Sequence, residues 1–356
     1  MSENFIRKRY TMVFITILAV IPVLFVTIGS LISAPKYKGP VSDHFDGKVF
    51  KNIDGVKAKG FKGIFKMLGQ RPTRGPWKEI HTIERQADPP VIVKEGVKIT
   101  FVNHSTFLIQ VAGLNILTDP VWSKRVSPFQ WAGPKRMRPP GLSMDQLPPI
   151  DIILLSHNHY DHLDLPTVQE VIKKHQPQIV TPLGVGQFIA QKTSGTATDL
   201  DWWGSFEFND QVKISAVPAQ HFSGRGILDR DATLWCGYII ETVDLKIYFA
   251  GDSGYGSFFK TIGERYPNID LALLPIGAYL PVWFMSPIHT TPEEAVKIHL
   301  DIQSKQSVAS HFGTFPLAYE GMEQAQLELH EALAKYDIPK DQFWILKEGE
   351  GRTLTS

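Results

Sequence analysis

The sequence has a single cysteine, Cys236, among its 356 residues. One thiol excludes an internal disulfide and a cysteine-rich zinc site, so any metal must be bound by histidine and carboxylate side chains. An excess of charge is also missing, because 37 Lys and Arg face 36 Asp and Glu and the net charge is +1. This balance gives no support for a nucleic-acid partner. With 43% hydrophobic and 21% charged residues, the chain has the composition of a folded globular protein.

Charged residues are absent from one long stretch, residues 10–33, which is rich in Ile, Val, Leu and Phe. About 20 such residues in a helix cross the ~30 Å hydrocarbon layer of a membrane. We therefore predict a membrane anchor over residues 1–34 with a transmembrane helix at 10–33. A cleaved signal peptide is the alternative, because it shares the basic start and the apolar core, but residues 31–34 make a poor cleavage site.

Basic residues on both sides of this stretch bear on its orientation. Arg7, Lys8 and Arg9 precede it and would stay cytoplasmic under the positive-inside rule. Lys36 and Lys38 on the other flank oppose that orientation. The resulting prediction is a single-pass membrane protein whose folded part lies on the non-cytoplasmic side.

Residues 35–90 are rich in Lys, Gly and Pro, which predicts a linker or strap rather than a domain. Four lysines stand close together in it, Lys57, Lys59, Lys62 and Lys66. They could contact anionic lipid, although a solvated face is the ordinary interpretation of such a cluster.

The folded domain is predicted over residues 91–356, beginning with a β-meander. Apolar and polar residues alternate at 97–101 and 107–111, and a short apolar run follows at 114–117. His104, in the first turn, is a candidate to support a ligand or a structural turn residue. Asp119, at the end of the third run, is a candidate to orient a metal-binding histidine. An Asx-turn before Pro120 is an equally open interpretation of Asp119.

Three histidines and a carboxylate lie within six residues, directly after the apolar run 152–155. They are His157, His159, Asp161 and His162, in the stretch SHNHYDHLD at 156–164. Imidazole and carboxylate are ligands of zinc and similar first-row ions, and four of them at the end of a buried strand do not pack as ordinary core. The spacing predicts a metal centre; a solvated histidine-rich loop is the alternative.

Three further polar residues stand where a predicted strand ends. His221, Asp252 and His311 follow the strands predicted at 212–217, 246–250 and 308–310. Since the strand ends along one edge of a sheet bring distant side chains together, we expect these residues to join the histidine cluster.

The order of these groups resembles that of the metallo-β-lactamase superfamily, whose fold is an αββα sandwich around two metal ions. Over about residues 101–350 the chain is similar to the N-acyl-phosphatidylethanolamine-hydrolysing phospholipase D family. The stretches that carry this similarity are 133–136, 156–164, 201–203, 249–255, 275–279, 283–285, 292–295 and 311–315. The expected molecule is this sandwich preceded by the transmembrane helix.

The resemblance implies two Zn²⁺ ions per subunit. The implied ligands are His157, His159 and His221 for one ion, Asp161, His162 and His311 for the other, and Asp252 as the bridge. Neutral histidines leave the charge of the ions uncancelled, which favours activation of water and stabilisation of a phosphoryl group. The implied reaction is hydrolysis of N-acyl-phosphatidylethanolamine to N-acylethanolamine and phosphatidic acid.

The resemblance also implies roles for residues around the metals. His289 is expected to contact the substrate, whereas the apolar Ile288 departs from the family at a place where a polar amide is expected. Asp161 or a metal-bound water could protonate the leaving group. Tyr160 and Tyr255 could line the site or pack as ordinary aromatic side chains.

Two other functions fit the same sequence. A hydrolase of a lactone or of another phosphodiester could use this metal centre, because one site can serve several substrates. A membrane-associated metal-binding or envelope protein without turnover is the second alternative. The predicted partners are a phospholipid or other small phosphodiester, the membrane, and a second copy of the chain in a homodimer; no nucleic acid is expected.

Overall fold

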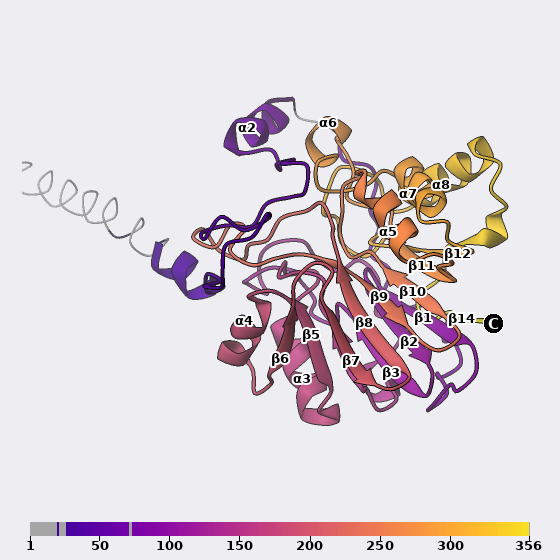
Figure 1. Cartoon of the computed structure of the whole chain (residues 1–356). Coiled ribbons are helices and arrows are strands. Elements are labelled where there is room, and N and C mark those ends of the chain that lie inside the picture. The colour runs from indigo at the N-terminus through magenta and orange to yellow at the C-terminus, as the bar shows by residue number, and fades with distance from the viewer. Residues whose placement is uncertain (1–19, 21–25, 71–72, 356) are drawn as a thin grey trace, which may run out of the picture.

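Two mixed seven-stranded sheets form the centre of the molecule (Figure 1). The structure, a computed structural model, describes residue 20, residues 26–70 and residues 73–355. The first sheet has the strand order β14-β1-β2-β3-β4-β5-β6 and the second the order β13-β12-β11-β10-β9-β8-β7.

In the first sheet, an antiparallel meander leads into parallel strands. Its strands are β1 (Val97–Asn103), β2 (Thr106–Val111), β3 (Leu114–Thr118), β4 (Ile152–Leu154), β5 (Gln178–Pro182), β6 (Ala197–Leu200) and β14 (Gly351–Leu354). The meander predicted from the alternating pattern is confirmed by the β1–β2 and β2–β3 pairings. Strand β4 lies between two parallel neighbours with both faces covered, which is why it consists of three apolar residues in a row.

The second sheet is antiparallel on one side and parallel on the other. Its strands are β7 (Ser205–Asn209), β8 (Val212–Val217), β9 (Gly237–Glu241), β10 (Lys246–Phe249), β11 (Leu271–Pro275), β12 (Gln306–Ser310) and β13 (Phe343–Trp344). The apolar pattern of the sequence predicts a strand over residues 234–241, but β9 begins only at Gly237. The reason is that the backbone N–H groups of Leu234 and Cys236 donate to Leu183 and Ser156, in loops of the first sheet.

The described helices lie outside the two sheets. They are α2 (Phe61–Gln70), α3 (Leu165–His175), α4 (Val185–Lys192), α5 (Phe258–Arg265), α6 (Val282–Met285), α7 (Pro292–Asp301) and α8 (Gln324–Lys335), with 3-10 turns η1 (Met144–Gln146) and η2 (Lys340–Gln342). Helices α3 and α4 lie beside β5 and β6, α7 lies beside β11 with α5 and α8 against it, and α2 and α6 lie beyond the sheets (Figure 1). The sequence predicts two helices in this region, one over 166–175 with a proline at an early position and a short one over 185–191, and they correspond to α3 and α4.

The main core fills the space between the two sheets. Side chains such as Phe101 and Ile152 from the first sheet meet Ile240 and Phe249 from the second, all with no more than 1% of their surface exposed. A second core lies under α3 and α4 on the outer face of the first sheet. The α/β prediction is therefore confirmed, with helices and two mixed sheets in layers.

The N-terminal predictions divide between described and undescribed residues. The transmembrane helix predicted at 10–33 lies mostly outside the described residues. Among the residues that the structure describes, none of the helices has the length and apolar character needed to span a bilayer. The boundary at residue 91 stays a prediction; the strap before it packs Phe45 and Phe50, each 2% exposed, into the main core.

Candidate metal centre

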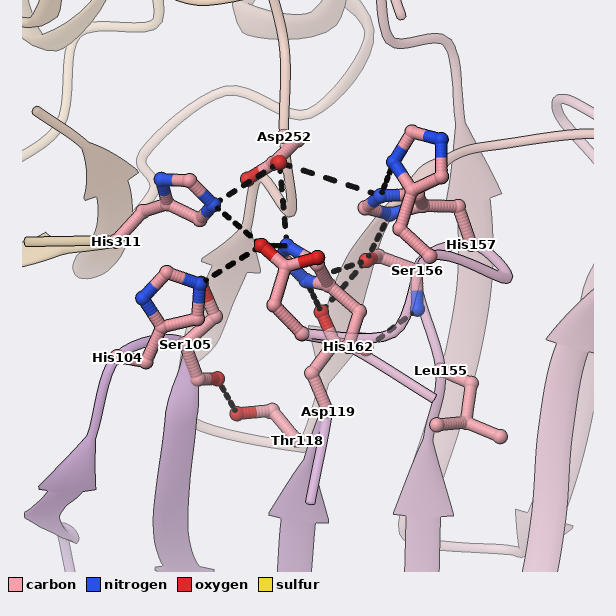
Figure 2. A network of polar contacts seen from close by, with 12 residues as sticks. His104, Ser105, Thr118, Asp119, Leu155, Ser156, His157, His162, Asp252 and His311 are labelled. Atoms are coloured by element: carbon pink, nitrogen blue, oxygen red, sulfur yellow. Dashed lines mark hydrogen bonds and ion pairs between the residues drawn. The ribbon is translucent and has the colours of Figure 1, made fainter. Parts of the chain in front are cut away.

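The polar residues predicted from strand ends meet at one edge of the two sheets. Figure 2 shows His157, His162, Asp252 and His311 close together there. From the first sheet, the loop after β4 contributes four of them, His157, His159, Asp161 and His162. Loops of the second sheet contribute the others: His221 follows β8, Asp252 follows β10, and His311 follows β12. The seven side chains come from four loops that are spread over about 150 positions of the sequence, from His157 to His311.

Three histidines form the first group. Nε2 of His157 lies 2.8 Å from Nδ1 of His159, and Nε2 of His221 lies 3.2 Å from the same Nδ1. Burial, together with the neighbouring histidines, holds the pKa of His157 well below its usual value, and burial lowers the pKa values of His159 and His221 to about 3. Neutral imidazoles with converging lone pairs have the chemistry of a metal-binding set.

The second group contains a carboxylate and two histidines. Nε2 of His162 and Nε2 of His311 lie 3.5 Å and 3.3 Å from Oδ2 of Asp161. Burial opposes protonation of both histidines, but the nearby carboxylates outweigh it, raising the pKa of His162 well above its usual value and that of His311 to about 9. The same carboxylates that raise these pKa values would also stabilise a cation placed between the rings.

Asp252 stands between the two groups. Its Oδ2 lies 3.1 Å from Nε2 of both His162 and His311, 3.7 Å from Nε2 of His221 and 4.0 Å from Nε2 of His157. One carboxylate oxygen therefore faces four imidazole nitrogens from both groups, which is the arrangement that a bridging ligand requires.

Several of these atoms are buried without hydrogen bonds. Nε2 of His162, Nε2 of His311 and Oδ1 of Asp252 have no hydrogen-bond partner within the described part of the chain, although the ion-pair distances are short. Buried polar atoms are normally satisfied, so converging but unsatisfied ligand atoms fit a bound cation. The donor set, His and Asp in two adjoining groups, is a binuclear metal site.

Groups behind the ligands fix their orientation. Oδ2 of Asp119 lies 2.6 Å from Nδ1 of His162 and accepts a hydrogen bond from the Ser156 hydroxyl at 2.6 Å. That hydroxyl also lies 2.9 Å from Nδ1 of His157, and Nδ1 of His221 lies 2.8 Å from the backbone oxygen of Ile288. Each of these three rings thus turns its other nitrogen toward the metal positions.

His104 lies closer to the centre than its sequence context indicates. Its Nε2 lies 3.1 Å from Oδ2 of Asp161, and its backbone oxygen accepts the N–H of His311 (Figure 2). Burial lowers the pKa of His104 to about 3, so the ring is neutral and donates to the carboxylate. The sequence pointed to His104 only through its position in a predicted turn. In the structure its backbone φ is 48°, in the left-handed region.

Of the three residues expected to contact the substrate, His289 lies beside the metal centre, whereas the hydroxyls of Tyr160 and Tyr255 bond to other groups. Nδ1 of His289 lies 3.8 Å from Oδ2 of Asp252, beside the metal centre. The hydroxyl of Tyr160 donates to the backbone oxygen of Arg225, and the hydroxyl of Tyr255 donates to Asp301 at 2.6 Å. Both hydroxyls are thus engaged by partners other than the metal-binding residues.

Comparisons with known proteins agree with this geometry. The family described as Beta-lactamase superfamily domain matches residues 114–312. An N-acyl-phosphatidylethanolamine-hydrolyzing phospholipase D of Caenorhabditis elegans is 37% identical over 273 residues, covering 72% of this chain and 76% of the relative. A mitochondrial protein of the same name from Saccharomyces cerevisiae is 36% identical over 244 residues, covering 67% of this chain and 52% of the relative.

The fold also matches solved structures. A metallo hydrolase from the archaeon Ignicoccus hospitalis aligns with a TM-score of 0.56 and 21% identity, covering 73% of this chain and 99% of that protein. An isothiocyanate hydrolase from gut bacteria of Delia radicum aligns with a TM-score of 0.58 and 21% identity, covering 73% of this chain and 100% of that protein. At this identity the likeness concerns the fold alone.

Proposed function

The chain belongs to the N-acyl-phosphatidylethanolamine-hydrolysing phospholipase D family of the metallo-β-lactamase superfamily, and on that premise we propose that it cleaves N-acyl-phosphatidylethanolamine to N-acylethanolamine and phosphatidic acid. The coarser statement, that it is a metal-dependent hydrolase, follows from the family and from the binuclear His/Asp site. The observation that carries the proposal is Oδ2 of Asp252, which faces nitrogens of both ligand groups.

The proposed cofactors are two Zn²⁺ ions per subunit. The proposed ligands are His157, His159 and His221 for one ion, Asp161, His162 and His311 for the other, and Asp252 for both. When bound, two such ions supply Lewis-acid activation of water and charge stabilisation for a phosphoryl group. Imidazole-rich ligand sets suit zinc, and the buried unsatisfied nitrogens described above support this assignment.

Asp161, one of the proposed ligands, was also a candidate to protonate the leaving group. Burial opposes ionisation of Asp161, but His162, His104 and His311 outweigh it and hold its pKa well below the usual range. Asp161 therefore enters the reaction as a carboxylate, so it holds charge rather than protonating the leaving alcohol.

His289 is the proposed substrate contact. Burial lowers its pKa to about 3, so the ring is neutral at physiological pH and offers one N–H donor and one acceptor. Its backbone N–H donates to Met285, which ties it to the end of α6. A neutral ring fixed beside Asp252 can donate a hydrogen bond to a phosphate oxygen without adding a charge. Tyr160 and Tyr255 are proposed as second contacts for the lipid, through their rings.

A membrane location is part of the proposal. It is supported by the uncharged stretch at residues 10–33 and by the basic residues 7–9 before it, which favour a single-pass anchor with the hydrolase domain on the non-cytoplasmic side. An anchored hydrolase meets a lipid substrate at high local concentration. The proposed homodimer stays a prediction.

A different substrate is the second candidate, and one observation favours it. Ile288 lies next to His289 and near the metal centre, because its backbone oxygen is 2.8 Å from Nδ1 of His221. Its buried side chain is apolar, whereas the family is expected to have a polar amide at this position. A changed headgroup or acyl-amide contact would shift the preference toward another phosphodiester or a lactone.

An assay of purified full-length protein tests these functions. The substrates are N-acyl-phosphatidylethanolamine, plain phosphatidylethanolamine, an acyl-homoserine lactone and bis-p-nitrophenyl phosphate, each with and without chelator. We expect chelator-sensitive release of N-acylethanolamine to exceed all other turnover. Preference for the lactone would support the second candidate, and no chelator-sensitive turnover would support a non-catalytic metal-binding protein.

A further inference from the structure

Among the four buried ligand histidines, one differs from the others in what its outer nitrogen meets. The outer nitrogens of three rings have acceptors, in the pairs His157 with Ser156, His162 with Asp119 and His221 with Ile288. Nδ1 of His311 is buried and has no hydrogen-bond partner among the residues that the structure describes. Because Nε2 of His311 faces the carboxylates, a cation bound there leaves Nδ1 protonated and in need of an acceptor.

A small cavity lies against this ring. Its volume is about 10 Å³, close to the space of a single water molecule. The walls are mostly apolar and buried, and they include Phe312, Phe315 and Met322. His311 and Glu320 also line it, so a carboxylate residue and the histidine with the unsatisfied nitrogen border the same small cavity.

Glu320 is an unusual residue to find there. It is only 6% exposed, and its two carboxylate oxygens accept the backbone N–H groups of Ala278 at 2.7 Å and Leu280 at 3.2 Å. Its own backbone oxygen accepts the indole N–H of Trp77, which fixes the loop in place. A buried carboxylate bonded only to neutral groups is costly unless a positive charge lies nearby.

We propose that Glu320 positions His311 by accepting, through one water molecule in this cavity, the hydrogen bond of the Nδ1–H group. The carboxylate then fixes the ring orientation and raises the basicity of Nε2, and the metal charge in turn offsets the burial of Glu320. This inference rests on the proposed function, because it assumes that His311 binds one of the two ions. Its specific content is that Glu320 acts on the ion of Asp161, His162 and His311, and not on the other.

Metal binding by the full-length protein tests the proposal independently of turnover. The protein is stripped with chelator and titrated with Co²⁺, following the visible absorption and competition with a chelating dye. We compare wild type, Glu320→Gln, and the matched control Glu331→Gln, which removes the same charge from an exposed position on α8. We expect Glu320→Gln to weaken one of two Co²⁺ sites by about 10–100-fold, with the other site within about twofold of wild type. The control should bind as wild type does.

Thermal unfolding with and without metal distinguishes the proposed role of Glu320 from a purely structural one. Glu320→Gln removes one acceptor from the backbone N–H groups of Ala278 and Leu280, so its metal-free midpoint should already lie below that of wild type. The proposal expects this difference to widen when metal is added, whereas the same difference with and without metal would show a purely structural role and overturn it. Equal weakening of both sites, or unchanged binding at both, would overturn it. Failure of wild type itself to bind two ions would instead strike the proposed function.

A crystal structure of the wild-type protein provides a second measurement that does not depend on a variant. The expected density is an ordered water within hydrogen-bond distance of both Nδ1 of His311 and the Glu320 carboxylate. A cavity without such a water, or Nδ1 bonded to another group, would contradict the proposal.

Discussion

Asp119 fixes the loop that carries four of the metal-binding side chains. Its two oxygens accept the backbone N–H of Ser156 at 2.7 Å and its hydroxyl at 2.6 Å, and Oδ2 also contacts His162. Burial raises the pKa of Asp119, while His162 and Ser156 act in the opposite direction. The Asp119 side chain therefore acts as the acceptor for three hydrogen bonds, two from Ser156 and one from His162.

Replacing Asp119 with Asn should weaken metal binding more than folding. The amide keeps the shape but presents N–H groups where an acceptor is needed, and loss of such a supporting partner typically costs 10–100-fold in metal affinity or activity. Metal affinity and the rate on bis-p-nitrophenyl phosphate are the measurements. Asp145→Asn, at a site whose side chain is 96% exposed, serves as the control. Wild-type affinity in Asp119→Asn would contradict the assigned role.

His44 connects the strap to the hydrolase domain at a distance from the metals. Its ring stacks on Trp202 with centroids 4.5 Å apart, and its nitrogens contact Asp43 at 2.6 Å and Asp201 at 2.7 Å. Burial opposes protonation of His44, but the hydrogen bonds to Asp201 and Asp43 outweigh it and raise its pKa above 6.5.

This raised pKa predicts a pH-dependent contribution to stability. Because the folded-state pKa exceeds the unfolded value, the contribution is fully present below about pH 6.5 and is lost as pH rises through the folded pKa. His44→Gln should therefore reduce the free energy of unfolding by about 1 kcal/mol at pH 5.5 and by less at pH 9. Urea unfolding of both proteins measures it, with His81→Gln as an exposed control. A difference that grows with pH would refute the sign.

At this scale the sequence predicted local patterns well and long-range contacts poorly. The four ligands at 157–162 were visible because a strand end and a dense His/Asp spacing are local features. The sequence left two interpretations of His104 open, as a ligand-supporting residue or a structural turn residue, and did not identify Glu320. The contacts that define both residues are with Asp161 and Ala278, 57 and 42 positions away. Neither carries a spacing signal of its own.

Among the elements, α2 combines exposed apolar and basic side chains. Phe65 is 71% exposed and Ile64 is 37% exposed, and all charged residues between positions 55 and 78 are Lys or Arg. The helix lies against α6, with Nζ of Lys66 over the Trp283 ring at 4.8 Å. Since α6 leads directly to His289, α2 stands beside the approach to the proposed active site.

We predict two separable contributions to membrane binding. Deleting the residues before Ala34 should release most of the protein from membranes while leaving hydrolysis of a soluble diester intact. Any remaining binding of that truncated protein to anionic vesicles should fall when Lys62 and Lys66 are both changed to Glu, because each basic residue near such a surface contributes roughly 1 kcal/mol. Vesicle co-sedimentation measures both effects. Loss of diester hydrolysis on truncation would show that the deleted residues support the fold.

Besides its apolar contacts, strand β9 of the second sheet forms a side-chain hydrogen bond to the loop after β4 of the first sheet. The Tyr238 hydroxyl donates to the backbone oxygen of Leu155 at 2.8 Å, directly before the metal-binding loop. Tyr248, on the neighbouring strand β10, is equally buried, but its hydroxyl has no hydrogen-bond partner among the described residues. The two tyrosines thus form a matched pair.

Removing each hydroxyl should have different consequences. Tyr238→Phe should lower the free energy of unfolding by about 1–2 kcal/mol, because the hydrogen bond is lost and a buried carbonyl loses a donor. Tyr248→Phe should leave it unchanged or raise it slightly. Denaturant titration of both variants measures the difference, and equal effects would show that the bond to Leu155 does not stabilise the pairing of the sheets.

The elements that the sequence predicted are those in which apolar and polar residues repeat at a regular spacing. The meander, β8, α3 and α4 lie where the pattern placed them, whereas β6, β7, β13 and β14 were not predicted. Strand β7 alternates between exposed and half-buried residues at an edge, and β13 has only two residues, so burial gives each of them little sequence signal.

For the whole molecule, the two sheets matter because each supplies part of the metal centre. The loop after β4 belongs to one sheet, and the loops that carry His221, Asp252 and His311 belong to the other. Local sequence patterns predicted the strands, but the pairing order and the way in which the sheets face each other depend on contacts between distant residues. The resemblance to a known family supplied that arrangement in advance.

Reconstitution with metal tests the central claim most directly. Full-length protein is stripped with chelator and titrated with Zn²⁺ while the release of N-acylethanolamine from N-acyl-phosphatidylethanolamine is measured. The account predicts no turnover without metal, recovery that saturates at two ions per chain, and no recovery in Asp252→Ala, whose circular dichroism should match wild type. Full turnover by the stripped protein, or by Asp252→Ala, would contradict it.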